Sequence, residues 1–444
     1  MSVTSKPEPT GAPRPHVPTA SAPSPTERQS LRRSMLGLGL GNTLEWYDWQ
    51  IFGLLAAVIG PHFFRTDTVL EATLATLSVF AVGFVARPIG GILLGGVADR
   101  IGRKAVMLWS VGLMAVTTLV IGVLPDVHTI GVAAPIILVV CRLLQGLSTG
   151  VEAPLSTAYG VEIMPHDKSG LAAGIISGFV NLGIMVGSLL NFLLSLTLGS
   201  AVMSDWGWRI PFWVGAAMGV VVVWLRRSLP ETLETSEPEY VGVTRDIWRQ
   251  VFGRWRSLLA VIFIVGAAQA FNYGWNVGLP NLARSTYGEN LTAVFGLTAV
   301  LSLFMVLGSP IVGQWTDRWK LGRTFVIGRW LMIPTVFLML LYTGPGLGGF
   351  AAVLLLGAPV LLLNMTLYVV TSTSLFPKGI RAAGGGLGYG VAVASMGGTA
   401  SYLVVWLGSK GLGWMFPVYA AALALISIVL YRSAREKEGI FVGE

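Results

Sequence analysis

Long apolar runs, each separated from the next by a few polar residues, fill the chain from Leu36 onward. An α-helix needs roughly 20 mostly apolar residues to cross the hydrocarbon core of a bilayer. About twelve runs reach that length, so the pattern predicts an all-α membrane protein with twelve transmembrane helices in two pseudo-symmetric halves of six. The expected spans are 36–60, 70–98, 104–124, 131–158, 168–196, 208–226, 256–280, 291–316, 323–343, 346–374, 380–408 and 411–432.

Composition and charge support the membrane class. Of 444 residues, 53% are hydrophobic and 12% are charged, whereas soluble domains carry about a quarter charged residues. The net charge of +8 does not indicate nucleic-acid binding, because the basic residues follow the topology instead of clustering on one face. Lys and Arg concentrate on the segments that are cytoplasmic if both termini are cytoplasmic, as the positive-inside rule requires. We therefore expect a multi-pass protein of the cell membrane with both termini in the cytoplasm.

Polar stretches divide the chain into two bundles and three cytoplasmic segments. The first stretch is rich in Pro, Ser and Thr and has no apolar run, so we expect it to be disordered and to carry no cleaved signal. A charged stretch between the sixth and seventh spans predicts a linker. The expected division is a tail at 1–33, a six-helix bundle at 34–226, a linker at 227–255, a second bundle at 256–433 and a tail at 434–444.

The two bundles carry a repeated loop. One copy begins at Gly95, after the second span, and the other begins at Gly313, after the eighth, with two extra residues. A loop repeated at corresponding places is typical of a transporter built from two related halves, whose substrate site lies near the midplane between them.

The first copy, Gly-x-x-x-Asp-Arg-x-Gly-Arg-Lys, resembles the signature of the major facilitator superfamily, and four other segments resemble its metabolite:proton symporter family. The resemblance implies proton-coupled import of a small polar metabolite, such as an organic acid or a proline- or betaine-like zwitterion, by alternating access. The alternative is a proton-antiport exporter of a drug or secondary metabolite on the same fold. Departures from the family pattern at Val151 and Ser401 leave the substrate open. The four segments are GNTLEWYD (41–48), GFVARPIGG (83–91), RLLQGLSTGVE (142–152) and GWRIPF (207–212).

Ionisable residues within the apolar runs are the candidates for proton coupling, because a buried charge is costly unless it is paired or useful. At about 1.5 Å per residue, Asp48 and Arg142 should both lie near the midplane. Glu45 lies three residues before Asp48, on the same side of the helix, and two close carboxylates favour protonation of one of them. Glu152 joins this set through the family pattern. The alternative is a static ion pair between Asp48 and Arg142. The histidines fall in the tail or loops and are not expected to relay protons: His16, His62, His128 and His166.

Arg87 is the first candidate for substrate binding, because a guanidinium can hold a carboxylate through two hydrogen bonds. Its alternative role is helix packing or snorkelling, and Arg329 is expected to snorkel to the interface. The aromatic residues of the seventh span suit a quaternary ammonium or else form an interfacial belt. Asparagine and tyrosine side chains of the second half offer hydrogen bonds to substrate or between helices. The remaining candidates are Tyr47, Tyr273, Trp275, Asn276, Asn364, Tyr368 and Tyr389.

The repeated loops are expected to act as gates. By resemblance, Asp99 faces the N-terminal end of the eleventh helix near Arg381, where the helix dipole favours a negative charge. Arg100 and Arg103 are expected to pair with acids on the cytoplasmic face. The alternative is a loop whose charges only set topology. Gly95 and Asp317 complete the predicted gating set.

The sequence lacks the motifs of ATP-driven proteins and of zinc proteins. There is no Gly-x-x-x-x-Gly-Lys-Ser/Thr phosphate loop, no cluster of zinc ligands and only one cysteine, Cys141. We expect no enzymatic activity and no cofactor. The expected partners are a small-molecule substrate, protons and the lipid bilayer, with no nucleic acid, and the protein is expected to act as a monomer.

Overall fold

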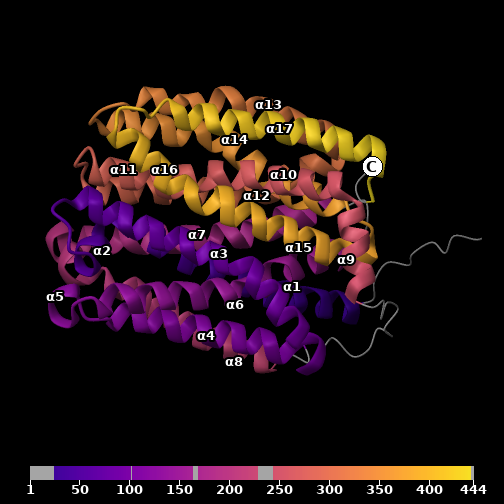
Figure 1. Ribbon diagram of the computed structural model, residues 1–444, viewed down its shortest axis with the longest axis horizontal. Helices are drawn as coiled ribbons and strands as arrows, with labels where there is room; N and C mark the ends of the chain where they lie inside the picture. Colours follow the sequence, from indigo (N-terminus) through magenta and orange to yellow (C-terminus); the bar gives the residue numbers. More distant parts are fainter. Residues whose placement is uncertain (1–24, 102, 164–168, 229–243, 442–444) are drawn as a thin grey trace, which may run out of the picture.

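The protein is a bundle of long helices that run side by side along one axis (Figure 1). Ten of them are long and apolar enough to cross a membrane, counted over the part of the chain that the structure describes. The shorter apolar helix at Arg209–Leu225 and the first helix, Pro25–Leu54 with its continuation Ala56–Phe63, complete twelve crossings. The predicted twelve-helix all-α membrane fold is confirmed. The computed structural model describes residues 25–101, 103–163, 169–228 and 244–441, and every element in these ranges is a helix.

The first half supplies six crossings. Its first helix begins at Pro25, earlier than the expected residue 36, and proline suits a helix start because its fixed φ is already helical. The same crossing breaks at Leu55 and continues in a short second helix. The bounds are α1 (Pro25–Leu54), α2 (Ala56–Phe63), α3 (Val69–Ile101), α4 (Arg103–Val123), α5 (Val127–Ile130), α6 (Ala133–Ile163), α7 (Ser169–Val202), η2 (Met203–Gly207) and α8 (Arg209–Ser228).

The second half supplies the other six crossings, two of which change from α-helix to a single π turn and back. A short helix, α9, lies across the bundle in Figure 1 and leads into this half. The bounds are α9 (Thr244–Gly253), α10 (Trp255–Tyr273), η3 (Gly274–Gly278), α11 (Leu279–Ser285), α12 (Leu291–Arg318), α13 (Leu321–Val336), η4 (Phe337–Leu341), α14 (Leu347–Ser374), η5 (Lys378–Ile380), α15 (Arg381–Ala392), η6 (Val393–Gly397), α16 (Gly398–Ser409) and α17 (Met415–Glu438).

The two halves meet chiefly along two long seams. Helix α7 packs against α12, α3 packs against α15 and α16, and α1 contacts η3. Below, the terminal end of the bundle is the end at which α17 finishes, and the opposite end is the one that carries α5. Helices α1, α3 and α7 of the first half thus supply residues to the interface between the halves.

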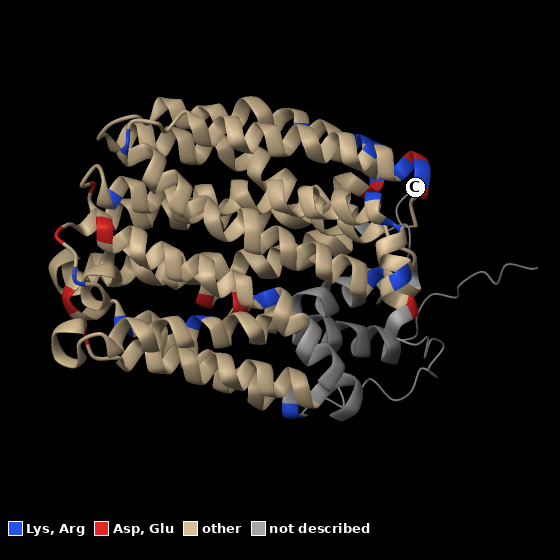
Figure 2. Cartoon of the chain, viewed as in Figure 1, with Lys and Arg blue, Asp and Glu red and all other residues tan. Residues whose placement is uncertain are grey.

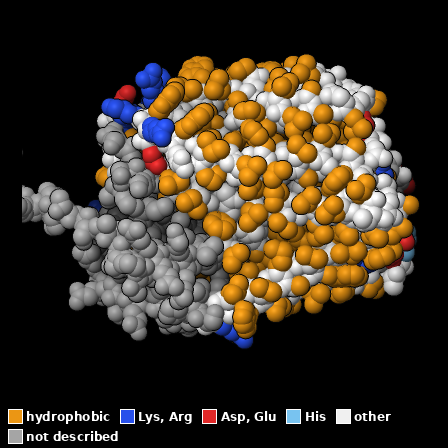
Figure 3. Space-filling model, turned by 180° about the vertical axis from the view of Figure 1, so that it is seen from behind, with side chains coloured by type: hydrophobic (Ala, Val, Ile, Leu, Met, Phe, Trp, Pro, Cys, Tyr) orange, Lys and Arg blue, Asp and Glu red, His pale blue; other side chains and the backbone are white. Residues whose placement is uncertain are grey.

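The outside of the bundle is apolar, as lipid contact requires. Figure 3 shows apolar side chains spread over the described part of one broad face, with charged side chains near its ends. Large apolar side chains on the outside are strongly exposed, among them Trp109 at 76% and Val132 at 77%. An exposed apolar surface of this extent fits a protein whose solvent is the bilayer.

Helices α3 and α6 approach closely because glycine faces glycine. A Cβ at Gly146 of α6 would collide with the carbonyl oxygen of Gly83 on α3 and would lie 2.9 Å from the Cβ of Ala86. Small residues allow helix backbones to approach in lipid, where packing drives association. This contact fixes the relative position of α3 and α6, which carry the two arginines of the site described below.

Gly146→Ala is expected to destabilise the protein by about 1–3 kcal/mol, because the added methyl has no room at this backbone contact. Gly112→Ala on α4 is the matched control, since a Cβ there meets nothing within 4 Å. Alanine favours a helix over glycine by about 0.8–1 kcal/mol, so the control should be neutral or stabilising. The thermal unfolding midpoint of the purified protein in detergent measures both. Equal midpoints for the two variants would contradict the packing argument.

Arg329 does not snorkel, and that prediction is wrong. Its side chain is 0% exposed, and its Nη2 donates to the carbonyl oxygen of Ile264 at 2.5 Å while its guanidinium lies 5.2 Å from the ring of Phe325. The expectation rested on distance along the helix, which does not say towards which side of the helix the side chain points. Arg329 instead joins α13 to α10 within the second half.

The last helix extends into the segment at 434–444 that the sequence predicts to be a cytoplasmic tail. Helix α17 continues to Glu438, whose carboxylate accepts hydrogen bonds from the N–H groups of Arg256 and Ser257 at 3.3 and 3.0 Å and from the Ser257 hydroxyl at 2.6 Å. A carboxylate at the start of a helix satisfies N–H groups that have no partner within the helix. Glu438 thus caps α10, the first crossing of the second half.

Candidate functional site

Two ion pairs lie inside the bundle, midway between its ends. Figure 2 shows acidic and basic residues there, among helices that are otherwise uncharged over most of their length. The pairs are Asp48 with Arg142, at 2.9 Å, and Glu45 with Arg87, at 3.1 Å. Each of the four side chains is at most 2% exposed, and a buried charge is tolerated only when it is paired and hydrogen-bonded.

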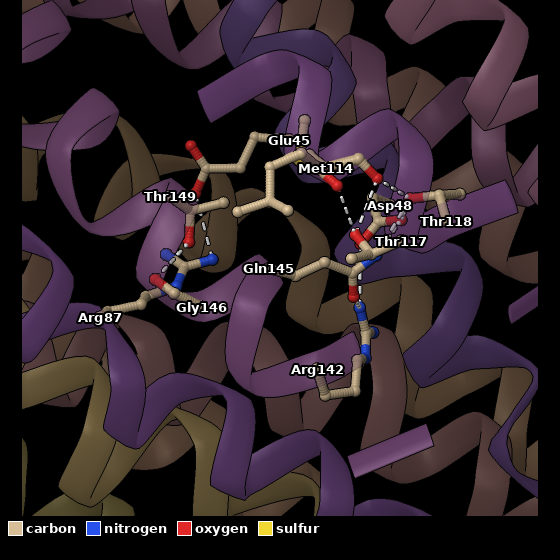
Figure 4. Close-up of polar contacts among 11 residues, drawn as sticks. Glu45, Asp48, Arg87, Met114, Thr117, Thr118, Arg142, Gln145, Gly146 and Thr149 are labelled. Carbon is tan, nitrogen blue, oxygen red and sulfur yellow. Dashed lines mark hydrogen bonds and ion pairs between the residues drawn. The ribbon is translucent and has the colours of Figure 1, made fainter. Parts of the chain in front are cut away.

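The Asp48 carboxylate of α1 is held by side chains from two other helices of the first half (Figure 4). Its Oδ2 accepts from Arg142 of α6, and its Oδ1 accepts from the Thr118 hydroxyl of α4 at 2.5 Å and from Gln145 Nε2 at 3.2 Å. Arg142 Nη1 also donates to Gln145 Oε1 at 2.5 Å. Three donors satisfy the ionised carboxylate, and protonation of Asp48 would disrupt the pair with Arg142.

Glu45 has a different arginine, and this second pair faces the other half of the protein. Arg87 of α3 binds Glu45 and also interacts with Tyr273 of α10 and Tyr389 of α15. In the second half, Gln269 Nε2 donates to the Tyr368 hydroxyl at 3.3 Å, and Tyr368 interacts in turn with Tyr389. The polar cluster therefore continues from the Glu45 and Arg87 pair into the second half.

Arginine N–H groups remain available at the centre. Within the described part of the chain, Nε and Nη1 of Arg87 and Nε and Nη2 of Arg142 have no hydrogen-bond partner, nor does the Tyr273 hydroxyl. Buried polar groups in folded proteins are almost always hydrogen-bonded. Nη2 of Arg87 binds Glu45, so Nε and Nη1 are the donors that a further acceptor, such as a carboxylate oxygen, could use.

Aromatic rings surround both guanidinium groups. Arg87 Cζ lies 4.4 Å from the ring centre of Trp49 and 4.7 Å from that of Phe84. Arg142 Cζ lies 3.7 Å from the ring centre of Phe52 and 4.7 Å from that of Trp49. These faces attract cations, and here they are covered by the arginines of the protein itself.

The structure brings Glu45, Asp48, Arg87 and Arg142 together, but it does not form a pair of neighbouring carboxylates that share one environment. Figure 4 shows Glu45 directed towards Arg87 while Asp48 is directed towards Thr118 and Gln145. The spacing of three residues placed both acids on one side of α1. It could not assign each acid its own arginine, because the partners come from separate helices.

Three predicted binding residues donate hydrogen bonds to backbone carbonyl groups of their own half. The Tyr47 hydroxyl donates to the carbonyl oxygen of Pro211 at 2.7 Å, and the Trp275 indole donates to that of Val353 at 3.2 Å. The Asn364 amide donates to the carbonyl oxygens of Gly328 and Val360 at 3.1 and 2.8 Å. These donors are occupied within one half of the protein in this structure, and a role of Tyr47, Trp275 and Asn364 in substrate binding stays a prediction.

The other second-half candidates lie at the interface. Tyr273 stacks on Trp46 of the first half with ring centres 6.1 Å apart, and Tyr389 contacts Arg87 as described. Gln50 of α1 donates to the carbonyl oxygen of Asn276 at 3.3 Å. The aromatic stretch 271–276 therefore combines interface residues with Trp275, whose indole donates within its own half.

Sequence reasoning missed several members of the site. Thr118, Trp49 and Gln269 received no role, although Trp49 follows Asp48 directly. Gln145 lies three residues after Arg142 and so shares its side of the helix. That spacing was the signal that could have placed Gln145 beside the Asp48 pair.

One predicted gating residue joins the two halves at the terminal end. Asp317 of α12 accepts from the N–H of Gly170 at 2.6 Å and from that of Leu171 at 2.9 Å, both at the start of α7. Arg381 is buried at the start of α15 and donates from Nε to the carbonyl oxygen of Phe376 at 3.3 Å. The side chains of the remaining predicted residues lie outside the described residues, so their roles stay predictions: Gly95, Asp99, Arg100, Arg103 and Glu152.

Asp317→Asn is expected to loosen the terminal end, because the neutral amide loses the attraction to the positive end of α7 and offers one acceptor in place of two. The measurement is hydrogen exchange of the peptide that contains the Gly170 and Leu171 amides, which should exchange faster in the variant. Asp205→Asn, at an exposed acid near the opposite end, is the control. Unchanged exchange in the Asp317 variant would show that the contact does not hold the halves together.

The halves are also joined at the opposite end. Asn281 Nδ2 donates to the carbonyl oxygen of Gly53 at 2.7 Å, and Asn281 Oδ1 accepts from the N–H of Ala57 at 2.9 Å. On the second seam, the hydroxyls of Ser195 and Thr292 are 2.7 Å apart. With inter-half hydrogen bonds at both ends and the central ion pairs buried, this structure encloses the site.

A twelve-crossing bundle of two halves, with buried charges enclosed at their interface, defines a secondary transporter. The sequence model of the Major Facilitator Superfamily matches residues 38–401, and the chain belongs to this superfamily. It is 32% identical to the alpha-ketoglutarate permease of Escherichia coli over 94% of this chain and 98% of that protein.

Two further similarities agree with this assignment. The chain is 28% identical to the ectoine/proline transporter ProP of Corynebacterium glutamicum, over 92% of this chain and 85% of that protein. The fold is similar to that of the proton:xylose symporter XylE bound to 6-bromo-6-deoxy-D-glucose, with a TM-score of 0.67 and 17% identity over 94% of this chain and 98% of that one. The superfamily predicted from the sequence is confirmed, and these relatives are transporters.

Proposed function

We propose that the protein imports a small organic anion together with protons, by alternating access of a central site between its two halves. The observation that carries this proposal is the Arg87 guanidinium, which is buried, faces the second half and has two donors without a partner. A substrate carboxylate would bind these donors and meet Tyr273 and Tyr389 on the other half. Contact with both halves is what allows a substrate to promote their relative movement.

The charges around the site favour an anion over a quaternary ammonium. Glu45 and Asp48 are each paired with an arginine, and the Trp49, Phe84 and Phe52 rings that could hold a cation already face guanidinium groups. The alpha-ketoglutarate permease and the citrate-proton symporter of Salmonella typhi, 29% identical to this chain, carry acids in their names. Other relatives are named as proline and betaine transporters. Proline and betaine also carry a carboxylate, but they carry a cationic nitrogen as well.

Protons would enter through the two carboxylates. A substrate carboxylate on the two available donors of Arg87 would lie near Glu45, which is held by the third nitrogen, and a proton on Glu45 would relieve the repulsion between the two anions. A proton on Asp48 would likewise release Arg142. Anion and proton would then be loaded together, which lowers the charge that must move through the bilayer.

The charge distribution also supports an orientation. Basic residues gather at the terminal end of the described chain, on α9, α13 and α17, whereas the opposite end carries fewer of them (Figure 2). By the positive-inside rule the terminal end is cytoplasmic in the cell membrane. We propose that the protein works there as a monomer, with the gate formed by Asp317 on its cytoplasmic side.

Uptake by proteoliposomes tests this function. Labelled dicarboxylate, tricarboxylate, shikimate, proline and glycine betaine are offered with and without an inward proton gradient, and gradient-stimulated accumulation of an acid is expected. Accumulation of betaine alone would overturn the anion class. Substrate-dependent proton exchange in the outward direction, without accumulation, would favour an exporter.

A further inference from the structure

Trp49 contacts both buried arginines of the site. Its ring centre lies 4.4 Å from Arg87 Cζ and 4.7 Å from Arg142 Cζ, and its side chain is 1% exposed. Among the described residues with such ring contacts, it is the one that contacts both guanidinium groups. One ring therefore lies beside the arginine of the substrate pair and the arginine of the Asp48 pair.

The ring is firmly held. Trp49 stacks on Phe84 with ring centres 4.0 Å apart and meets Phe80 edge to face at 5.5 Å. Gly83 leaves the space that the indole needs, since a Cβ there would lie 2.9 Å from Trp49 Cη2. A ring packed in this way cannot follow one arginine without affecting its contact with the other.

The same turn of α1 carries the acids. Glu45 lies four residues before Trp49, on the same side of the helix, and Asp48 lies directly before it. Glu45 draws Arg87 to this turn, and Asp48 draws Arg142 to it. The buried ring contacts both cations, and charges interact more strongly where water is excluded.

We propose that Trp49 is the positioning residue that couples substrate binding at Arg87 to proton uptake at Asp48. This inference rests on the proposed function. When a substrate carboxylate neutralises Arg87, the positive field at Asp48 weakens and protonation of Asp48 is favoured. The effect depends on a fixed, dry separation of the two arginines, which Trp49 provides. Without the ring, water would screen the two sites from each other.

Neighbouring aromatic residues give matched controls, because each faces one arginine. Phe84 faces Arg87 at 4.7 Å, and Phe52 faces Arg142 at 3.7 Å. Phe84→Leu should change the KM for substrate by a similar factor at every pH. Phe52→Leu should shift the pH dependence of uptake with little change in KM at its optimum. Trp49→Leu should affect both properties, and Trp49→Phe should restore most of the coupling.

The experiment measures the KM of substrate uptake from pH 5 to pH 8 in proteoliposomes, together with gradient-free exchange of labelled for unlabelled substrate. For Trp49→Leu we expect exchange to persist, the change of KM with pH to fall at least threefold, and gradient-driven accumulation to drop towards the exchange level. Unaltered pH dependence of KM in Trp49→Leu, with wild-type uptake still gradient-driven, would overturn the coupling role alone. Absence of gradient-driven uptake in the wild type would instead overturn the proposed function. Equal loss of exchange in Trp49→Leu and Trp49→Phe would mean that the ring serves only the fold.

Discussion

Asp48→Asn is expected to abolish proton-driven accumulation of substrate while leaving substrate exchange in place. Asparagine keeps the size of the side chain and an oxygen that accepts from Thr118, but it cannot take up or release a proton in the working pH range. A proton gradient would then no longer drive a net flux. Proteoliposomes that carry internal substrate measure both properties, since exchange needs no gradient.

Because Asp48 is paired with the buried Arg142, the test needs a second variant that removes both charges. Removing one member of a buried ion pair leaves an uncompensated charge and costs about 3–5 kcal/mol, so Asp48→Asn alone is expected to be less stable. Combining it with Arg142→Gln removes both charges and should recover stability without recovering accumulation. Accumulation at the wild-type level in either variant would show that Asp48 does not carry the coupled proton.

Arg87→Lys is expected to raise the KM for an organic acid by roughly ten- to a hundredfold, while affecting a cationic or neutral compound far less. Lysine keeps the charge that pairs with Glu45, but it offers a point charge in place of the planar fork. Each hydrogen bond to a charged group contributes about 1.5–3 kcal/mol, and 1.4 kcal/mol corresponds to a tenfold change in affinity.

The control for this variant is Arg284→Lys, which makes the same change near the opposite end of the bundle, where Arg284 donates to the carbonyl oxygen of Glu289. Initial uptake rates over a range of concentrations, at constant pH, separate KM from maximal rate. An equal loss for acids and cations in Arg87→Lys would remove Arg87 from substrate recognition and leave it a packing role.

The fold could be predicted from the sequence because the bilayer imposes the lengths of the apolar runs. A run that is too short or interrupted by charge cannot cross, so the spans were expected close to where the helices lie. Depth along a helix was equally useful for Asp48 and Arg142, because the rise per residue is constant. The two residues were expected near the midplane, and the structure pairs them there at 2.9 Å.

Rotation of a helix about its axis was much harder to predict. In a soluble protein the polar side of a helix faces water, but here the lipid and the protein core are both apolar, and the sequence pattern hardly distinguishes them. Trp275 and Arg329 show the consequence. Arg329 was expected to reach the membrane–water interface but is fully buried within the second half, and the fully buried indole of Trp275 donates to a carbonyl oxygen of the same half.

Which residues of distant segments contact one another could not be predicted from the sequence either. Glu45 and Arg87 come from α1 and α3, and the contact between α3 and α6 that sets the position of Arg87 depends on glycines far apart in the chain. Such spacings are common in membrane helices, so they did not single out this contact. The close approach became evident only from the arrangement of the helices.

Glu438, at the end of α17, caps the start of α10, so hydrogen bonds join the last and first helices of the second half directly. Its first crossing and its last are therefore neighbours in space, and the half is a closed unit whose entry and exit lie together. Units with adjacent ends tolerate rearranged connectivity, because a new link between the ends needs little chain. Such a half could be fused in tandem to a second copy of itself, or circularly permuted so that its chain begins at another helix. In both cases its helices would keep the same packing arrangement.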